Sequence, residues 1–487
     1  MGELHRAGMW LSLLVVAAAD VSMHCDLGVV GAGPGGMYVA YRHVAEHPNA
    51  TVCVFELSHR VGGRVHSLRH QGPQSDLVVE AGAYRFAPNK TCIHRGNFSL
   101  CLYTPLTAAL IMDALKLPSK RYNPAPGQYD SGLLKIIDLK TGHDAGYLSF
   151  VEAMLAHTQT SATPTAEAST FSFLPFHEVV SIAAESGKPL SVSFASGASA
   201  TCDKLVLNVP QRPLLRLLAA SPTLTPPGSP WPTVLNVPSA FPILKLYVHY
   251  EDAWWINSLG LRSGHFNNSA LWHAQPANPM QKDDCIASHQ APLPVQGSYH
   301  DGDVRCDLSG GQCRGFLQAA YMGDVQAVRA YEQYHLSGND SVVTLDPKAP
   351  HHAHLLAEVH ETLVALHEAP LKAAGAYDHV KGLAPSGGVL SIWSQRVAGI
   401  ETGCHIPKVG PPIDPADVPR KALRPLADQR IWIANEAFGP IDCWAEGSLI
   451  MAENVAHQLG LGKPKWLPQP IYDKVIFPSP GDLPRQG

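Results

Sequence analysis

The chain carries little charge and no long apolar run, and each absence excludes a class of protein. Charged residues make up 16% of its 487 positions, and the formal net charge is −5. A chain without a basic excess lacks the contacts that phosphates require, so we expect no nucleic acid partner. The longest clean apolar stretch, 9–19, is well short of the roughly 20 residues that cross a bilayer. The sequence therefore predicts no membrane anchor.

The cysteine spacing typical of metal sites is also missing. None of the ten cysteines has C-x-x-C spacing, and we predict no metal site. What the chain does have is 45% hydrophobic residues, with 41 Gly and 41 Pro. This composition excludes a disordered protein, and the length is sufficient for two domains.

The N-terminus has the layout of a secretory signal. Arg6 precedes the apolar stretch, and Ala17 and Ala19 are the small residues of a cleavage site, so residues 1–19 are predicted to be removed. The alternative is a buried N-terminal helix. N-x-S/T sequons support an extracellular or periplasmic, glycosylated protein; they lie at Asn49, Asn89, Asn97, Asn267 and Asn339.

The cysteines fit the same oxidising compartment. Two pairs are close in sequence and are expected to form disulfides: Cys92 with Cys101, and Cys306 with Cys313. Cys53 and Cys202 lie in apolar, strand-like runs, so we interpret them as buried thiols.

The order of elements predicts an α/β protein with two domains. An apolar run at 27–31, a helical stretch at 36–46 and a second apolar run at 51–56 form a βαβ opening. We expect a Rossmann-like nucleotide-binding domain assembled from the discontinuous segments 25–100, 171–237 and 396–465. The rest is predicted to be a substrate domain with a mixed sheet: 238–345 supplies that sheet with a long hairpin insertion, 101–170 and 346–395 are mainly helical, and 468–487 is a tail without an element.

The first loop carries a dinucleotide fingerprint. Gly31, Gly33 and Gly36 fit G-x-G-x-x-G directly after a strand and at the start of a helix, and Glu56 follows twenty residues after the last glycine. The glycines permit the tight turn, the approach of a pyrophosphate and close helix packing, while Glu56 can accept from a ribose hydroxyl. The fingerprint does not distinguish FAD from NAD.

The residues that follow make this distinction. Glu56-Leu-Ser-His-Arg-Val-Gly62-Gly63-Arg64 resembles the E-x-x-x-R-x-G-G-R motif of the flavin-containing amine oxidase family. The resemblance implies FAD, with Gly62, Gly63 and Arg64 around its pyrophosphate.

Weaker resemblances extend over most of the chain. The family binds its cofactor at positions that correspond here to Gly82, Ala83, Val179, Glu436 and Glu446. Asn435 replaces a glycine that is usual before the acidic residue of the A-G-E turn, which places the geometry of that turn in question.

Three further positions resemble the substrate site of the L-amino-acid oxidase branch. Arg85 matches the arginine that presents two donors to the substrate carboxylate, although it can instead pair with an internal acid such as Glu80. Lys245, inside an apolar run, matches the lysine that holds a water against the flavin and is the expected catalytic residue. Trp444 matches a tryptophan that walls the substrate, and either Trp272 or His273 is the opposite wall.

The resemblance leaves some alternatives open. Cys404 is a free thiol, a disulfide partner of Cys443, or the site of a thioether to FAD. The expected function is a secreted FAD-dependent L-amino-acid oxidase that converts amino acids and dioxygen to 2-oxo acids, ammonia and hydrogen peroxide. The alternatives are an amine or polyamine oxidase, and a flavin-binding protein without turnover. A homo-oligomer remains open.

Overall fold

The structure is a computed structural model that describes residues 23–89, 91–95, 98–122, 130, 132–162, 170–226, 228–268, 293–307, 311–335, 340–408 and 413–476. The expected signal peptide, the sequons at Asn97 and Asn339, and the candidate wall residues Trp272 and His273 lie outside this part. No helix among the described residues is both long enough and apolar enough to cross a membrane.

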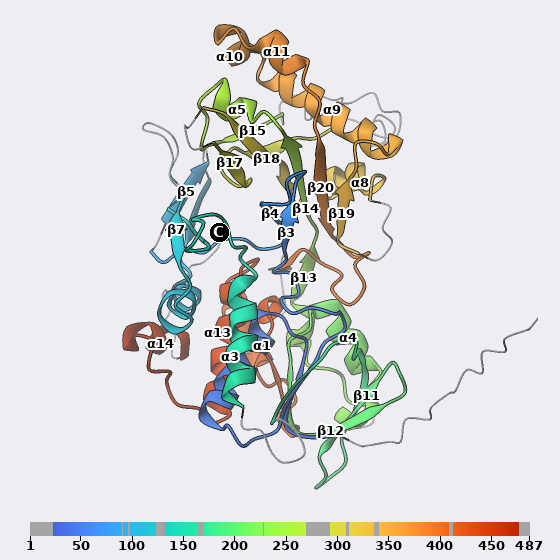
Figure 1. Cartoon of the computed structure of the whole chain (residues 1–487). Coiled ribbons are helices and arrows are strands. Elements are labelled where there is room, and N and C mark those ends of the chain that lie inside the picture. The colour runs from blue at the N-terminus through green and yellow to red at the C-terminus, as the bar shows by residue number, and fades with distance from the viewer. Residues whose placement is uncertain are drawn as a thin grey trace, which may run out of the picture.

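A seven-stranded sheet forms one half of the molecule and contains the predicted βαβ opening (Figure 1). Its central strand β1 pairs in parallel with β2 and β12, so their carboxyl ends meet at one edge. The antiparallel pairs β10 with β11 and β11 with β12 extend the sheet on one side. Its strands are β1 (Met23–Val30), β2 (Val52–Phe55), β9 (Phe171–Leu174), β10 (Val179–Ala183), β11 (Leu190–Phe194), β12 (Ser199–Leu207) and β22 (Ile431–Ile433).

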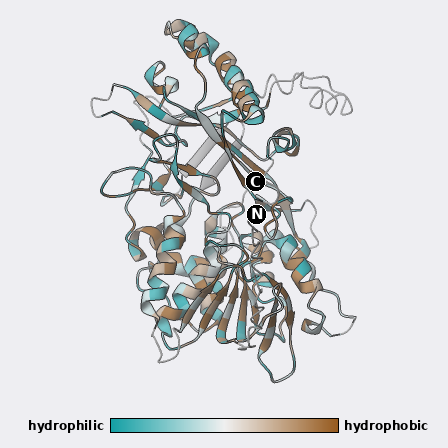
Figure 2. Ribbon diagram, turned by 45° about the vertical axis from the view of Figure 1, so that its right-hand side comes forward, coloured by the Kyte–Doolittle hydropathy of each residue, from teal (hydrophilic) through white to brown (hydrophobic). Residues whose placement is uncertain are grey.

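Helices cover this first sheet because their apolar faces bury against it. In Figure 1 the helices α1 (Pro34–Glu46), α3 (Ser149–Ser161) and α13 (Ala445–Gln458) lie together beside the strands. Figure 2 shows that the strands of this sheet are predominantly hydrophobic, as expected for a sheet buried on both faces. The observed layers confirm the predicted α/β class.

A second seven-stranded sheet, antiparallel and centred on β14, forms the other half. Its strands are β14 (Ile243–Tyr250), β15 (His265–Asn267), β16 (Gln296–Ser298), β17 (Val304–Cys306), β18 (Cys313–Met322), β19 (Val342–Leu345) and β20 (Gly387–Trp393). The helices α9 (Pro350–Leu366), α10 (Glu368–Ala373) and α11 (Tyr377–Lys381) lie at the far end of this half in Figure 1.

Two expectations about element type need correction. The helices α9, α10 and α11 make 346–395 mainly helical, as expected, but the prediction did not include the strand β20 at the end of this range, which is buried along its whole length beside β14. A buried strand reads as a continuous apolar run and lacks the alternation that reveals a strand with one wet face. The tail also contains a helix, α14 (Gln469–Ile476), which buries Tyr472, Val475 and Ile476.

Shorter elements connect the two halves or surround them. The strands are β3 (Ser67–Gln71), β4 (Leu77–Glu80), β5 (Thr91–Arg95), β6 (Phe98–Leu102), β7 (Ser119–Arg121), β8 (Leu134–Ile136), β13 (Pro238–Phe241) and β21 (Cys404–Pro407). The helices and single turns are α2 (Pro105–Ala109), η1 (Leu110–Ala114), α4 (Gln211–Ala219), η2 (Pro222–Leu224), η3 (Thr233–Asn236), α5 (Trp254–Asn257), α8 (Val325–Glu332), η4 (Pro415–Asp417), α12 (Val418–Ala422) and η5 (Glu436–Phe438).

The cysteine predictions have mixed outcomes. The Cys306–Cys313 disulfide and the buried Cys202 thiol are confirmed. Cys53 is not a thiol, because it forms a disulfide with Cys25 across the neighbouring strands β1 and β2. That pairing depends on strand adjacency, which the isolated apolar runs do not reveal. The side chains of Cys92 and Cys101 lie outside the described part.

Candidate active site

A cavity of about 680 Å³ begins at the carboxyl edge of the first sheet and reaches the second sheet. Residues of the glycine loop line one end, and Lys245, Tyr321, Trp393 and Trp444 also line it. The cavity therefore joins the predicted dinucleotide site to a region walled by aromatic side chains.

The glycine loop has the geometry of a pyrophosphate cradle. Gly31 has a φ of +94°, and an added Cβ would lie 2.6 Å from the Asn208 carbonyl oxygen. Gly33 precedes α1 and provides no side-chain cap, so the first amides of this helix remain open to an anion at the cavity wall. Gly36 lies farther inside, where an added Cβ would be 2.1 Å from the Gly31 carbonyl oxygen. These glycines fit the predicted roles.

Glu56 stands at the end of β2 and also lines the cavity. Its carboxylate accepts from the Ala32 amide at 2.8 Å and from the Ser58 amide at 2.8 Å. These two bonds hold both oxygens beside the glycine loop. Oε1 also accepts from the Ser58 hydroxyl at 2.7 Å, so both of its lone pairs are used, whereas Oε2 retains a lone pair that can accept from a ribose hydroxyl.

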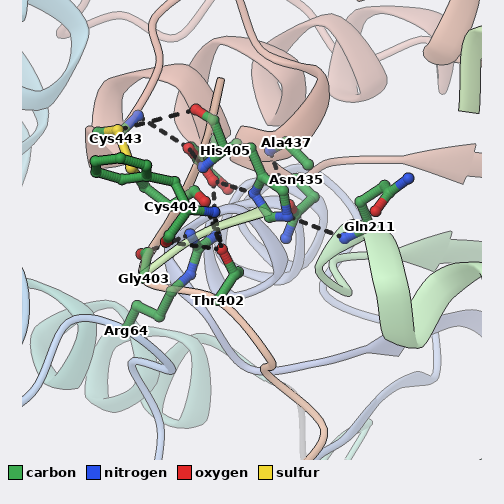
Figure 3. Close-up of polar contacts among 12 residues, drawn as sticks. Arg64, Gln211, Thr402, Gly403, Cys404, His405, Asn435, Ala437 and Cys443 are labelled. Atoms are coloured by element: carbon green, nitrogen blue, oxygen red, sulfur yellow. Dashed lines mark hydrogen bonds and ion pairs between the residues drawn. A yellow bond between two sulfur atoms is a disulfide. The ribbon is translucent and has the colours of Figure 1, made fainter. Parts of the chain in front are cut away.

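Arg64, which is labelled in Figure 3, pairs with Glu436, and both residues line the cavity. The guanidinium donates to a Glu436 oxygen at 2.8 Å and to the Gly403 carbonyl at 3.0 Å. The same carboxylate accepts from His405 Nδ1 at 2.9 Å and from the Cys443 amide at 2.9 Å. Burial alone would raise the pKa of Glu436, but Arg64 and His405 hold it well below its usual range.

His405 is a site residue that the sequence reasoning missed. Its Nε2 accepts from the Gln211 amide at 3.4 Å, which leaves the proton on Nδ1 for the bond to Glu436. Burial lowers the pKa of His405, in keeping with this neutral ring. The neighbouring Cys404 forms a disulfide with Cys443, which selects the disulfide among the three alternatives for Cys404.

The segment after β4 lies against the turn that contains Arg64. The Gly82 amide donates to the His66 carbonyl at 3.0 Å, and the Ala83 amide donates to the Arg64 carbonyl at 2.9 Å. Gly82, Ala83 and Val179 all line the cavity, as does Gly63. Gly62 does not line the cavity. Its φ is +102°, and its amide donates to the Ala32 carbonyl, so it stabilises the turn without facing the cavity.

Glu446 has a different place from the one expected. It is fully buried and does not line the cavity. Its carboxylate accepts from the amides of Leu106 and Thr107 at 2.9 and 2.7 Å, and therefore caps the start of α2. Sequence spacing placed it near the flavin because the motif is local, whereas the helix it caps lies about 340 positions away.

The backbone conformation of Asn435 shows that the A-G-E turn does not need a glycine at this position. Its φ is −122°, an extended conformation that needs no glycine, and its side chain accepts from the Ala437 amide. It contacts Asn208 Oδ1 through its own Nδ2 at 3.4 Å. Asn208 was also missed, although a polar residue at the end of the apolar run of β12 was a signal for it.

Lys245 lies in β14 at the cavity wall and is 2% exposed. Its Nζ donates to the carbonyls of Glu80, at 3.1 Å, and Gly82. Burial lowers its pKa, partly opposed by Glu80 and Asp301. A neutral amine satisfies both its N–H donors with these two carbonyls and keeps a lone pair, so this lysine is suited to accept a proton.

Arg85 is not at the cavity wall. Its guanidinium lies 3.0 Å from Asp301, and the exposed fractions of the two side chains are 12% and 2%. The alternative of an internal acid is therefore the observed one, with Asp301 in place of Glu80. The partner is 216 positions away, and the local motif contains nothing that indicates it.

Trp444 lines the cavity as the cap residue before α13, and two other aromatic residues accompany it. Trp393 ends β20 and donates from its indole to the Ala81 carbonyl at 2.7 Å. Tyr321 stands opposite Lys245 in the β14–β18 register. Tyr321 and Trp393 carry no local signal in the sequence, because each is an aromatic residue near the end of an apolar run.

Comparisons with known proteins agree with this geometry. A family model of the NAD(P)-binding Rossmann-like domain matches residues 29–95. Achacin of Lissachatina fulica is 41% identical over 68 residues, which are 14% of this chain and 12% of achacin. The matched segment thus spans about an eighth of that relative.

A solved structure extends the likeness to the whole fold. A putrescine oxidase variant, from a redesign of cofactor binding, superposes with a TM-score of 0.50 at 14% identity, covering 90% of this chain and 99% of its own. These findings show a Rossmann-like dinucleotide-binding domain within the fold of a known oxidase, and they agree with FAD, the cofactor that the E-x-x-x-R-x-G-G-R resemblance implies. The residues fit that group: the glycine cradle, the open start of α1, and Glu56 and Arg64 would hold its dinucleotide part.

Proposed function

We propose that the protein is an FAD-dependent oxidoreductase that oxidises the carbon–nitrogen bond of a small amine with dioxygen as acceptor. FAD, when bound, supplies the hydride acceptor and the reaction with dioxygen. The support is one continuous cavity that joins the dinucleotide cradle to Lys245 and three aromatic side chains. The aromatic walls would orient the substrate and exclude water. Lys245 would accept the proton that the substrate ammonium must lose before oxidation.

The substrate class we propose is an amine without an α-carboxylate. The observation that carries this choice is the Arg85–Asp301 pair, which is buried away from the cavity lining. A substrate carboxylate at Arg85 would have to displace Asp301, and a buried charge left without its partner costs about 3–5 kcal/mol. This burial favours the amine alternative over the L-amino-acid oxidase that the Gly82–Arg85 motif indicated.

Matched substrates test the proposal. The purified protein, with its flavin spectrum recorded, is assayed for peroxide with each L-amino acid and with the amine formed from it by decarboxylation, for example ornithine against putrescine and phenylalanine against phenylethylamine. We expect peroxide from amines. Peroxide from L-amino acids alone would contradict the substrate class, and a bound flavin that no substrate bleaches anaerobically would contradict the enzyme itself.

We also propose that the protein enters the secretory pathway. Three disulfides join described cysteines, which is typical of an oxidising compartment, and the sequon asparagines Asn49, Asn89 and Asn267 are exposed. Expression of the full chain in a eukaryotic secretory host tests this. We expect a mature N-terminus at Asp20 and a loss of mass on treatment with a glycosidase; an intact Met1 on a cell-retained, unglycosylated protein would contradict it.

A further inference from the structure

The ring of Tyr84 lies against two basic side chains, those of Lys245 and Arg85. Lys245 Nζ is 3.7 Å from the ring centroid, and the Arg85 Cζ is 4.4 Å from it. Tyr321 packs edge-on to the same ring, with centroids 5.9 Å apart. Both Tyr84 and Lys245 are at most 5% exposed, so these contacts are made away from bulk water. The Arg85 guanidinium, and Lys245 once it has accepted a proton, are attracted at these distances to the face of the desolvated ring.

Asp301 connects this ring to the ion pair behind it. Its carboxylate accepts hydrogen bonds from the Arg85 guanidinium at 3.0 Å and from the Tyr84 hydroxyl at 3.2 Å. Ser298 donates to the same carboxylate at 2.7 Å, which further immobilises it. Tyr84 is thereby held at its hydroxyl by Asp301 while its ring contacts Lys245. Of these residues only Lys245 lines the cavity.

We propose that Arg85 and Asp301 are positioning residues that act on Lys245 through the Tyr84 ring, and that Arg85 is not a substrate anchor. This inference rests on the proposed function, which it deepens by explaining how the proton acceptor is held. Asp301 fixes the Tyr84 ring, the ring supports the Lys245 side chain, and the two opposite charges of the pair set the potential at Nζ. Neither partner needs to touch the substrate.

Electrostatics support the geometry. Burial lowers the pKa of Lys245, Glu80 and Asp301 raise it, and Arg85 lowers it further. Burial alone would raise the pKa of Asp301, but Arg85 holds it well below its usual range, so the pair stays ionised. The ionisable groups that face Lys245 are the carboxyls of Glu80 and Asp301, the guanidinium of Arg85 and the phenols of Tyr84, Tyr247 and Tyr321.

The charge of Lys245 can be read directly in the holoenzyme. Protein labelled with ¹³Cε-lysine is titrated by NMR, and the Lys245 signal is identified by its absence in Lys245→Met. Arg85→Met removes the positive charge and leaves the negative charge of Asp301 unpaired, so the pKa of Lys245 should rise by about 1. In Asp301→Asn it should fall by a similar amount. Arg85→Lys retains the charge and is the matched control, with a smaller change expected.

The double variant Arg85→Met/Asp301→Asn removes both charges and should return the Lys245 pKa toward the wild-type value. It also guards against misfolding of Arg85→Met, because no buried charge is left unpaired. If Arg85→Met does not fold, Asp301→Asn decides by itself: a lowered pKa supports the inference, and an unchanged one overturns it.

Kinetics provide the second readout. We expect the acid limb of the kcat profile to move with the Lys245 pKa, upward in Arg85→Met, while KM for an amine stays within about twofold. An unmoved Lys245 pKa in all variants would overturn the inference. So would a large KM increase confined to L-amino acids in Arg85→Met, which would restore the anchor role. The titration needs no turnover, so its result is separate from that of the substrate panel.

Discussion

Arg64 and Glu436 lie 372 positions apart in the chain and form an ion pair of 2.8 Å on the wall of the dinucleotide cavity. Each was expected to contact the cofactor independently, but in the structure one holds the other. Glu436 therefore fixes the direction of the guanidinium, and Arg64 retains further N–H groups for a pyrophosphate. The pair makes the cofactor site depend on contacts between both ends of the chain.

Cofactor affinity should depend on this pair. We expect Glu436→Gln to weaken FAD binding about tenfold, or about 1.4 kcal/mol, because Arg64 loses the carboxylate that orients it. Fluorescence titration of the apoprotein with FAD measures the change. Glu152→Gln is the matched control, since Glu152 pairs with Arg69 outside the cavity lining. Equal affinities in the two variants would contradict the orienting role of Glu436.

The Cys404–Cys443 disulfide should matter for cofactor retention more than the Cys306–Cys313 disulfide. Cys443 lines the cavity and its amide binds Glu436, so Cys404→Ser/Cys443→Ser should release FAD more readily and lower the unfolding free energy by about 2–4 kcal/mol. Cys306→Ser/Cys313→Ser should retain FAD. Retention is measured by gel filtration and flavin absorbance. Intact mass after denaturation should show no flavin adduct; an adduct would assign Cys404 to a thioether instead.

Glu446 should make stability depend on pH between about 4.5 and 7. Burial raises its pKa to about 7, so the folded state binds more protons than the unfolded state in this range. The free energy of unfolding is therefore highest at low pH, and it falls by about 3 kcal/mol in all as the pH rises through this range. Glu446→Gln should flatten this slope in denaturant unfolding from pH 5 to pH 8. The surface variant Glu361→Gln should leave the slope unchanged, and parallel slopes in all three proteins would refute the prediction.

Gly82 should not tolerate a side chain. An added Cβ would lie 1.9 Å from the Arg64 carbonyl oxygen, which is backbone and cannot move aside cheaply. We expect Gly82→Ala to lower the unfolding free energy by about 1–3 kcal/mol and to reduce FAD content. Gly382→Ala, whose Cβ would meet ordinary contacts at 3.4 Å, is the control, with a change within about 0.5 kcal/mol. Thermal unfolding and flavin absorbance measure both variants.

The local motifs determined the first βαβ unit and its cofactor cradle. Gly31, Gly33, Glu56 and Arg64 belong to one short stretch whose strand, turn and helix follow from glycine conformation and apolar periodicity. Local patterns of this kind carry their geometry with them. Lys245 and Trp444 were predicted from the family resemblance, and both line the cavity.

Only the tertiary structure decided which partner each polar group would find. Arg85 meets Asp301, and Glu446 caps α2 instead of facing the cavity. Cys53 joins Cys25 because two strands are neighbours. A buried charge or donor takes whatever complementary group the packed sheets bring within about 3 Å. That group lies tens to hundreds of residues away, so no local pattern of the sequence encodes it.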